Sequence, residues 1–278
     1  MAARRVPVAV AAAAVVALTL AQASVVCGLM VAVHSDSPPN STAPMTGNTT
    51  VLPGLGGAEG RDGFLTVFAN AAAGFSIQAQ SPTCMGRVKT SVTAKAHDCV
   101  YAVNGGPFNM DTGKCEGVVI AENVMRAGGW NATGGNALFG VTASRQWVLG
   151  AVTEGDARWL GVTSLVTGFG WLVQDGKSVV ATPGGEVAPR TAIGVDSAGR
   201  LLLLEVDGCE KCAVPQGLTL HKLAALMASD AVGARYAINL DGGGSSVFVR
   251  RNKIVDSPTC NDVPKECERA VASIVCVK

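Results

Sequence analysis

The sequence predicts an α+β protein with a mixed, strand-rich sheet core, a few flanking helices and stabilising disulfide bonds. Short β-branched or aromatic runs alternate with Gly, Asp and Asn turns from about Phe64 onward, and one segment has helical spacing. Eight cysteines follow an apolar leader. The 278 residues are 48% hydrophobic and 15% charged, which indicates a compact globule and not a disordered chain.

Residues 1–33 are predicted to be a signal peptide or an N-terminal membrane anchor. Arg4 and Arg5 precede an apolar run that reaches Val33 without a charged side chain. Cleavage after Ala23 fits the small-x-small pattern there, whereas the uncut run is long enough to cross a bilayer. Both alternatives direct the chain into the secretory pathway, and any membrane contact is expected through this segment.

Residues 34–62 are rich in Ser, Thr, Pro, Gly and Asn and show no apolar period, which predicts a linker or stalk. Residues 63–278 are then expected to form one domain. Acceptor motifs for N-glycosylation at Asn40, Asn48 and Asn131 agree with a lumenal or extracellular protein. The net charge of +1, with no basic stripe, argues against nucleic acid as a partner.

The strands are expected in chain order at FLTVFAN, FSIQAQ, CVYAVN, GVVIAEN, ALFGVTA, QWVLGAV, LVTGFGWLVQ, TAIGVD, RLLLLEVDG, RYAINLD, SVFVR and ASIVCV. TAIGVD and RLLLLEVDG flank a Ser-Ala-Gly turn and predict a β-hairpin. Leu202 and Leu204 lie on one face of its second strand, with Leu201 and Leu203 on the other. Apolar residues on both faces indicate a central strand that is covered on both sides.

One helix is expected among the strands, over LHKLAALMASD. Thr219 can cap it, and its apolar residues recur at helical spacing, namely Leu220, Leu223, Leu226 and Met227.

Three predicted strands end in a polar residue followed by glycine, in YAVNGGPF, LLLLEVDG and YAINLDGGGSS. Asn-Gly and Asp-Gly are ordinary turn dipeptides, but three in one domain favour a ligand site at one rim of the sheet. Glycines leave room for a ligand, and backbone N–H groups with a hydroxyl suit a phosphate or a sugar. The predicted substrate-binding residues are Asn104, Gly105, Gly106, Gly242, Gly243, Gly244 and Ser245.

Asp207 and Asp241 close two of these strands and Arg190 opens another. Hydrolysis of a sugar phosphate needs a carboxylate that attacks the anomeric carbon or activates water, and a cation that holds the leaving phosphate. We therefore predict these three residues as catalytic, the alternative for Arg190 being an exposed salt bridge. Glu205 shares the strand face of Asp207 but lies deeper, which makes it a weaker candidate. No cofactor is required, although Asp207, Asp241 and Asn104 are compatible with a divalent metal.

The cysteine spacing predicts one local disulfide, because Cys260 and Cys267 close a short loop. Cys209-Glu-Lys-Cys212 is compatible with a redox motif or half of a zinc site, although the secretory leader favours a structural bridge. Spacing alone fixes no other pair.

Several motifs follow one another between about Cys84 and Val277: VNGGPF with TGKCEG, PRTAIGVDSAGRLLLLEVDG, INLDGGGSSVFV, and CNDVPKEC with SIVCV. In this combination the sequence closely resembles the phosphodiester glycosidase family. The resemblance implies a lumenal hydrolase of the Golgi that removes α-linked N-acetylglucosamine (GlcNAc) from a GlcNAc-1-phospho-6-mannose diester. The implied partner is a phosphorylated high-mannose glycoprotein, on which mannose 6-phosphate would be exposed for lysosomal targeting.

The resemblance also implies positions for site residues and disulfides. The family's polar site positions fall on Asn104, Arg190, Asp207, Asp241 and Ser245. The implied disulfides are Cys84–Cys115, Cys99–Cys276 and Cys260–Cys267. Cys209 and Cys212 are then left to pair with each other, and this last pair departs from the family pattern.

Known members continue into an EGF-like module and a C-terminal membrane span, whereas this sequence ends at Lys278. We therefore expect any anchor at the N-terminus. Two other functions stay open: hydrolysis of another sugar-phosphate diester in a surface polysaccharide, and glycan binding without turnover.

Overall fold

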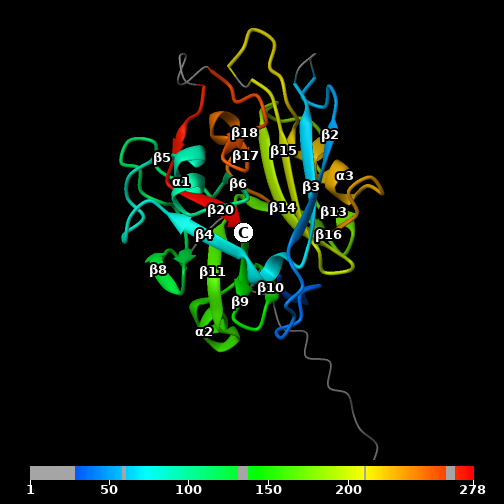
Figure 1. The fold of residues 1–278 in the computed structure, drawn as a ribbon. Coiled ribbons are helices and arrows are strands. Elements are labelled where there is room, and N and C mark those ends of the chain that lie inside the picture. Colours follow the sequence, from blue (N-terminus) through cyan, green and yellow to red (C-terminus); the bar gives the residue numbers. More distant parts are fainter. Residues whose placement is uncertain (1–28, 58–60, 131–136, 210, 261–266) are drawn as a thin grey trace, which may run out of the picture.

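The strands of the protein form three main sheets and one short two-stranded ladder (Figure 1). The computed structural model describes residues 29–57, 61–130, 137–209, 211–260 and 267–278. Within these residues strands far outnumber helices, and the helices lie on the outside of the sheets. The predicted α+β class with a strand-rich, mixed core is confirmed.

The largest sheet has seven strands in the order β13-β12-β16-β14-β15-β3-β2, with antiparallel neighbours. The predicted hairpin forms its centre, because β14 (Arg190–Asp196) pairs with β15 (Leu201–Val206). The other strands are β2 (Thr46–Leu52), β3 (Gly63–Ala69), β12 (Gly170–Gln174), β13 (Lys177–Ser178) and β16 (Ala234–Asn239).

The two faces of β15 pack into different cores, as expected for a covered central strand. Leu201 and Leu203 belong to the large core that the three main sheets share. Leu202 and Leu204 belong to a second core, which contains Leu223 and Met227 of the helix α3 (Leu220–Ala228). Burial of each leucine side chain stabilises the fold by about 1.5–3 kcal/mol.

The other two main sheets complete the large core. The six-stranded sheet has the order β1-β10-β9-β11-β7-β8, and the five-stranded sheet the order β18-β17-β6-β20-β4. The strands of the first are β1 (Met30–His34), β7 (Val119–Ala121), β8 (Val124–Ala127), β9 (Leu138–Thr142), β10 (Gln146–Gly150) and β11 (Val162–Thr167). Those of the second are β4 (Phe75–Ala79), β6 (Tyr101–Asn104), β17 (Phe248–Arg250), β18 (Lys253–Ile254) and β20 (Ser273–Val277). The ladder pairs β5 (Val88–Lys89) with β19 (Ala270–Val271).

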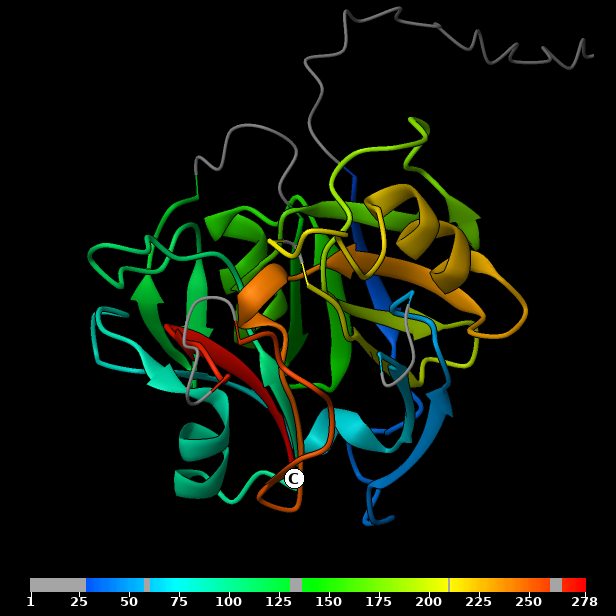
Figure 2. The ribbon, with the colours of Figure 1, turned by 90° about the horizontal axis from the view of Figure 1, so that it is seen from above.

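Aromatic side chains fill the large core. Figure 2 shows, from above, the sheets that surround this core. The Phe75 ring meets the Trp147 ring edge-on, with centroids 5.3 Å apart. The Trp147 indole N–H donates to the Gly199 carbonyl at 2.9 Å, so the six-stranded sheet is bonded to the turn of the central hairpin.

The predicted helix is confirmed as α3, which begins after Thr219. The Thr219 hydroxyl accepts a bond from the Lys222 backbone N–H at 3.3 Å, as an N-cap does. Two further α-helices, α1 (Thr90–Ala96) and α2 (Glu154–Leu160), were not expected from the sequence. Short 3₁₀ turns lie at Ala71–Ala73 and Gly243–Ser245.

The interpretation of residues 34–62 as a linker is wrong for residues 46–52, which form β2 along the whole of β3. The reason is that an edge strand needs only one partner and can expose one face, so polar threonines suffice there. Residues 30–33, assigned to the leader, instead form most of β1, where Val31 and Val33 pack against the large core. Residues 1–28 lie outside the described part of the chain.

All four expected disulfides are present: Cys84–Cys115, Cys99–Cys276, Cys209–Cys212 and Cys260–Cys267. Cys209 and Cys212 thus form the predicted bridge with each other, and its structural role stays a prediction.

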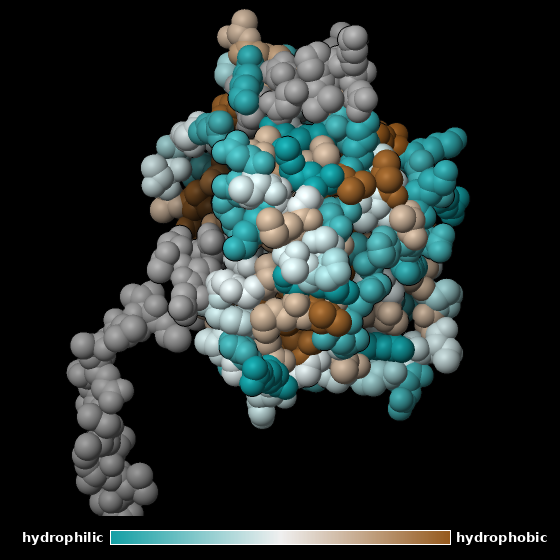
Figure 3. Space-filling view, turned by 90° about the vertical axis from the view of Figure 1, so that its left-hand side faces the viewer, coloured by the Kyte–Doolittle hydropathy of each residue, from teal (hydrophilic) through white to brown (hydrophobic). Residues whose placement is uncertain are grey.

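Two of the glycosylation motifs can be placed. Asn40 and Asn48 are exposed, whereas Asn131 lies outside the described residues. The face in Figure 3 is mostly hydrophilic, with separate small apolar patches. Within the residues that the structure describes, no helix has both the length and the apolar character to cross a membrane.

Candidate active site

Two strand-end motifs, 137 residues apart, are joined by hydrogen bonds. The Asn104 side-chain amide at the end of β6 donates to the Asp241 carbonyl at 2.7 Å. The Asp241 backbone N–H in turn donates to the Gly105 carbonyl at 3.1 Å. The predicted convergence of the two loops is therefore real, and it joins the five-stranded sheet to the seven-stranded sheet.

A cavity of about 300 Å³ opens beside this junction. We call it the strand-end cavity; its lining residues are Phe169, Glu186, Ala188, Arg190, Leu220, Asn239, Asp241, Gly242, Gly243 and Arg269. Of the residues predicted from the sequence, it brings together Arg190, Asp241, Gly242 and Gly243.

Arg190, at the start of β14, is only 8% exposed. Its Nε donates to the Leu218 carbonyl at 2.9 Å and its Nη2 donates to the Glu186 carbonyl at 2.6 Å. These bonds fix the plane of the guanidinium group, which keeps its charge at any physiological pH. The result is an oriented cation in a partly enclosed cavity, where an anion would be attracted strongly.

Asp241 lies in the loop after β16. One carboxylate oxygen accepts the Gly242 backbone N–H at 3.0 Å. The Gly243 N–H donates to the Pro189 carbonyl at 2.9 Å and Gly243 has φ of +58°, a left-handed conformation that favours glycine. The glycine loop is thus fastened to the residue before Arg190, which places the carboxylate beside the guanidinium in the same cavity.

The structure does not bring the other predicted binding residues into this cavity. Asn104 is fully buried, and its amide oxygen accepts the Thr191 hydroxyl at 2.8 Å, so its side chain holds the loop from behind. A Cβ on Gly106 would overlap the Thr167 carbonyl and one on Gly105 would lie 2.8 Å from the Ser273 carbonyl. These two glycines therefore permit close packing of backbones. Neither Gly244 nor Ser245, both fully enclosed, lines the cavity.

The sequence did not predict the other six lining residues, of which Glu186, Arg269, Asn239 and Phe169 are polar or aromatic. Arg269, just before β19, donates from Nη1 to the Ser245 hydroxyl at 3.2 Å. Asn239 is 5% exposed, and its side-chain oxygen has no hydrogen-bond partner among the described residues. Phe169 is 49% exposed. The signals that could have found Arg269 and Asn239 are those used for Arg190 and Asp241: a charged or polar residue at the end of an apolar strand.

Asp207 lies apart from the cavity because of side-chain alternation. Arg190 pairs with Val206 and Ala192 pairs with Asn239, so these side chains share the face covered by α3. Glu205 pairs with Thr191 and points to the other face, where Asp207 lies with it. Burial raises the pKa of Asp207. Two hydrogen bonds from the backbone N–H groups of Ser257 and Asp62 lower it, but by less than burial raises it. A catalytic role for Asp207 therefore stays a prediction.

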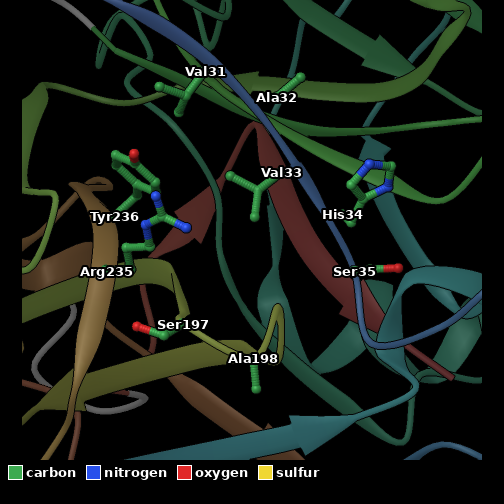
Figure 4. A pocket seen from close by; sticks show the side chains of 9 residues that line it. All are labelled: Val31, Ala32, Val33, His34, Ser35, Ser197, Ala198, Arg235 and Tyr236. Carbon is green, nitrogen blue, oxygen red and sulfur yellow. The ribbon is translucent and has the colours of Figure 1, made fainter.

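A larger cavity, of about 460 Å³, lies between β1 and the central hairpin (Figure 4). Val33 stands in its middle, with Tyr236 and Arg235 on one side and His34 on the other. Among the residues that the structure describes, neither a carboxylate nor a glycine loop lines it. On chemistry, and not on size, the strand-end cavity is the better candidate site.

Two arginines and a carboxylate in one cavity have the chemistry that suits a phosphate-bearing ligand, and a partly exposed aromatic ring has the chemistry that suits a sugar. Residues 97–278 match the model of the phosphodiester glycosidase family. The chain belongs to this family.

Named relatives agree with that membership. The human and bovine proteins named N-acetylglucosamine-1-phosphodiester alpha-N-acetylglucosaminidase are both 33% identical, over 70% and 69% of this chain and 41% and 39% of their own. The chain thus spans about two fifths of the length of these relatives. The zebrafish catalytic domain of the same name, auto-inhibited by pro-peptide, has a TM-score of 0.73 at 25% identity and covers 90% of this chain and 87% of its own. A hypothetical protein from Synechocystis shares the fold, with a TM-score of 0.58 at 14% identity over 84% of this chain and 62% of its own.

Proposed function

We propose that this protein hydrolyses a sugar-1-phosphodiester by breaking the bond between the anomeric carbon and the phosphate oxygen. The observation that carries the proposal is that Arg190, Arg269 and the Asp241 carboxylate line one cavity. Membership of the phosphodiester glycosidase family supports it, as do the names of the relatives.

In this reaction the two guanidinium groups bind the phosphate and stabilise the negative charge that it gains as it leaves. Asp241 either attacks the anomeric carbon or takes a proton from the attacking water. Glu186, the second carboxylate of the cavity, is available for the complementary proton transfer. The electrons of the broken bond stay on the phosphate. The final bond joins the anomeric carbon to the water oxygen, and where Asp241 has attacked first, this water displaces the Asp241 carboxylate from the anomeric carbon. The products are a free sugar and a phosphate monoester.

The sugar ring would contact Phe169 and Asn239. A half-exposed phenyl ring offers an apolar face against which a pyranose can stack. The unpartnered Asn239 oxygen would accept a hydrogen bond from a sugar hydroxyl or an acetamido N–H, which would satisfy a buried polar atom.

For the particular substrate we propose GlcNAc-α-1-phospho-6-mannose on a phosphorylated high-mannose glycoprotein, so that hydrolysis exposes mannose 6-phosphate. The names of the mammalian relatives support the GlcNAc-1-phosphodiester part of this substrate. Four disulfides support a location in a lumen of the secretory pathway, and we propose the lumen of the Golgi.

The test is to incubate the purified protein with GlcNAc-1-phosphomannose diester and to measure released GlcNAc and mannose 6-phosphate. We expect release that is lost in Asp241→Asn and kept in Asp175→Asn, an exposed control. No release from a folded protein would refute the substrate. Turnover of a polysaccharide phosphodiester in its place would favour hydrolysis of a surface polysaccharide. Calorimetric binding of the diester without turnover would favour glycan binding alone.

A further inference from the structure

Three carboxylates meet on the face of the seven-stranded sheet that is opposite the strand-end cavity. They belong to Glu205 of β15, Asp207 directly after β15, and Asp256 after β18. One oxygen of each lies within 4.8 Å of the others. We call this group the acidic triad.

Glu205 is the unusual member. It is 1% exposed, and neither carboxylate oxygen has a hydrogen-bond partner among the described residues. Its position continues the alternation of Leu201 and Leu203, which point into the large core. A carboxylate therefore stands where the strand pattern calls for an apolar side chain, and it is directed at two other carboxylates.

The other two members are only partly satisfied. Asp256 accepts the Phe248 N–H at 2.9 Å through Oδ1, but its Oδ2 is buried without a partner among the described residues. Each Asp207 oxygen accepts one backbone N–H, from Ser257 at 2.7 Å and from Asp62 at 3.0 Å, and keeps a second lone pair. The backbone thus orients two carboxylates toward Glu205 and leaves acceptor capacity at the centre.

Such a group is destabilising unless its charge is neutralised. Burial raises the pKa of Glu205 and of Asp256, and the neighbouring acidic groups raise both further. Arg61 lowers the pKa of Asp207 and donates from Nη1 to the Ser257 carbonyl at 2.8 Å, but no cation among the described residues counters the shifts of Glu205 and Asp256. Neutralisation therefore requires either shared protons or a bound cation.

We propose that the acidic triad binds a divalent cation, and that the cation is Ca²⁺. Among the described residues, two Glu205 oxygens and one Asp256 oxygen have no hydrogen-bond partner. With the remaining lone pairs of Asp207 they give an all-oxygen donor set, which hard cations prefer. Ca²⁺ accepts bidentate carboxylates and irregular geometry, whereas Mg²⁺ requires near-octahedral geometry and keeps several waters. The near-complete burial of Glu205 leaves little room for those waters.

The bound cation would link β15 of the seven-stranded sheet to the segment after β18 of the five-stranded sheet. Glu205 is the register partner of Thr191, whose hydroxyl bonds to Asn104 behind the strand-end cavity. The site would thus stabilise the sheet junction without touching the substrate, and the inference does not depend on the proposed reaction.

The test uses the whole protein after dialysis against a chelator. Calcium chloride is titrated by calorimetry, and thermal unfolding is followed with and without Ca²⁺. We expect one Ca²⁺ per chain, and a Tm that rises by roughly 5–10 °C at a Ca²⁺ concentration about a hundred times Kd. Glu205→Gln, which keeps the shape, should weaken Ca²⁺ binding at least about tenfold. The exposed Glu116→Gln should not change it.

The competing explanation, shared protons, gives opposite results. It predicts no heat of Ca²⁺ binding, an unchanged Tm after chelation and a Glu205→Gln variant at least as stable as the parent. If Glu205→Gln does not fold, the calorimetry and the Tm of the parent protein still decide, and Asp256→Asn repeats the comparison. Absence of both calcium effects in the parent protein overturns the proposal.

Discussion

Replacement of Arg190 by glutamine is the sharpest test of the strand-end cavity. Arg190 is 8% exposed, and its guanidinium donates hydrogen bonds of 2.9 and 2.6 Å to two carbonyls, so it is already oriented before substrate binds. Loss of one preorganised donor to a developing oxyanion costs about 10²–10³ in turnover, and we expect Arg190→Gln to fall in this range. The loss should appear mainly in kcat, because the charge on the leaving phosphate grows only in the transition state.

The assay is steady-state release of GlcNAc from the phosphodiester, with the fold checked by thermal unfolding. Arg190→Lys keeps the charge but cannot donate to both carbonyls from one rigid fork, so its activity should lie between those of the parent and Arg190→Gln. The control is Arg158→Gln, since that side chain is 78% exposed on α2. A folded Arg190→Gln protein with unchanged kcat/KM would show that the leaving phosphate does not rely on this arginine.

Three further predictions concern the sugar pocket, the sheet junction and the second core. Phe169→Ala and Asn239→Ala should each raise KM for the diester more than they lower kcat, as measured in the same assay; an unchanged KM would place the sugar elsewhere. Gly106→Ala should destabilise the protein by about 1–3 kcal/mol in urea unfolding, because its Cβ would overlap the Thr167 carbonyl. Leu204→Ala should cost about 2–5 kcal/mol in the same measurement, since a fully buried leucine against α3 leaves a cavity. A loss well below 1 kcal/mol in either variant would contradict the packing described.

The hairpin of β14 and β15 and the helix α3 could be predicted because their signals are local. The Ser-Ala-Gly turn, the alternation of leucines and the Thr219 cap each act within a few residues. β2 could not be recognised, since the pairing with β3 that stabilises it depends on a strand outside its own segment. α1 has two threonines and a valine in seven residues, which lowers its intrinsic helix propensity.

The candidate site could be predicted as a set of strand ends, but not as a cavity. Asp207 follows β15 and Asp241 follows β16. Both strands pair antiparallel with β14, so their C-terminal ends lie at the same end of the sheet. Which face each side chain takes depends on register, and register placed Asp241 with Arg190 and Asp207 with Glu205. Arg269 reaches the cavity only through packing of the C-terminal segment against the glycine loop, for which no local pattern exists.

The place of β20 has a consequence for the order in which the site is assembled. This strand lies between β6 and β4, and its Cys276 is bonded to Cys99, 177 residues earlier in the sequence. Because a ribosome makes β4 and β6 well before β20, these two strands must wait for the strand that joins them. Asn104 pairs with Ile274 in that ladder, so the junction behind the strand-end cavity can close only after β20 has been made. The junction should therefore form late in folding, together with the Cys99–Cys276 bond.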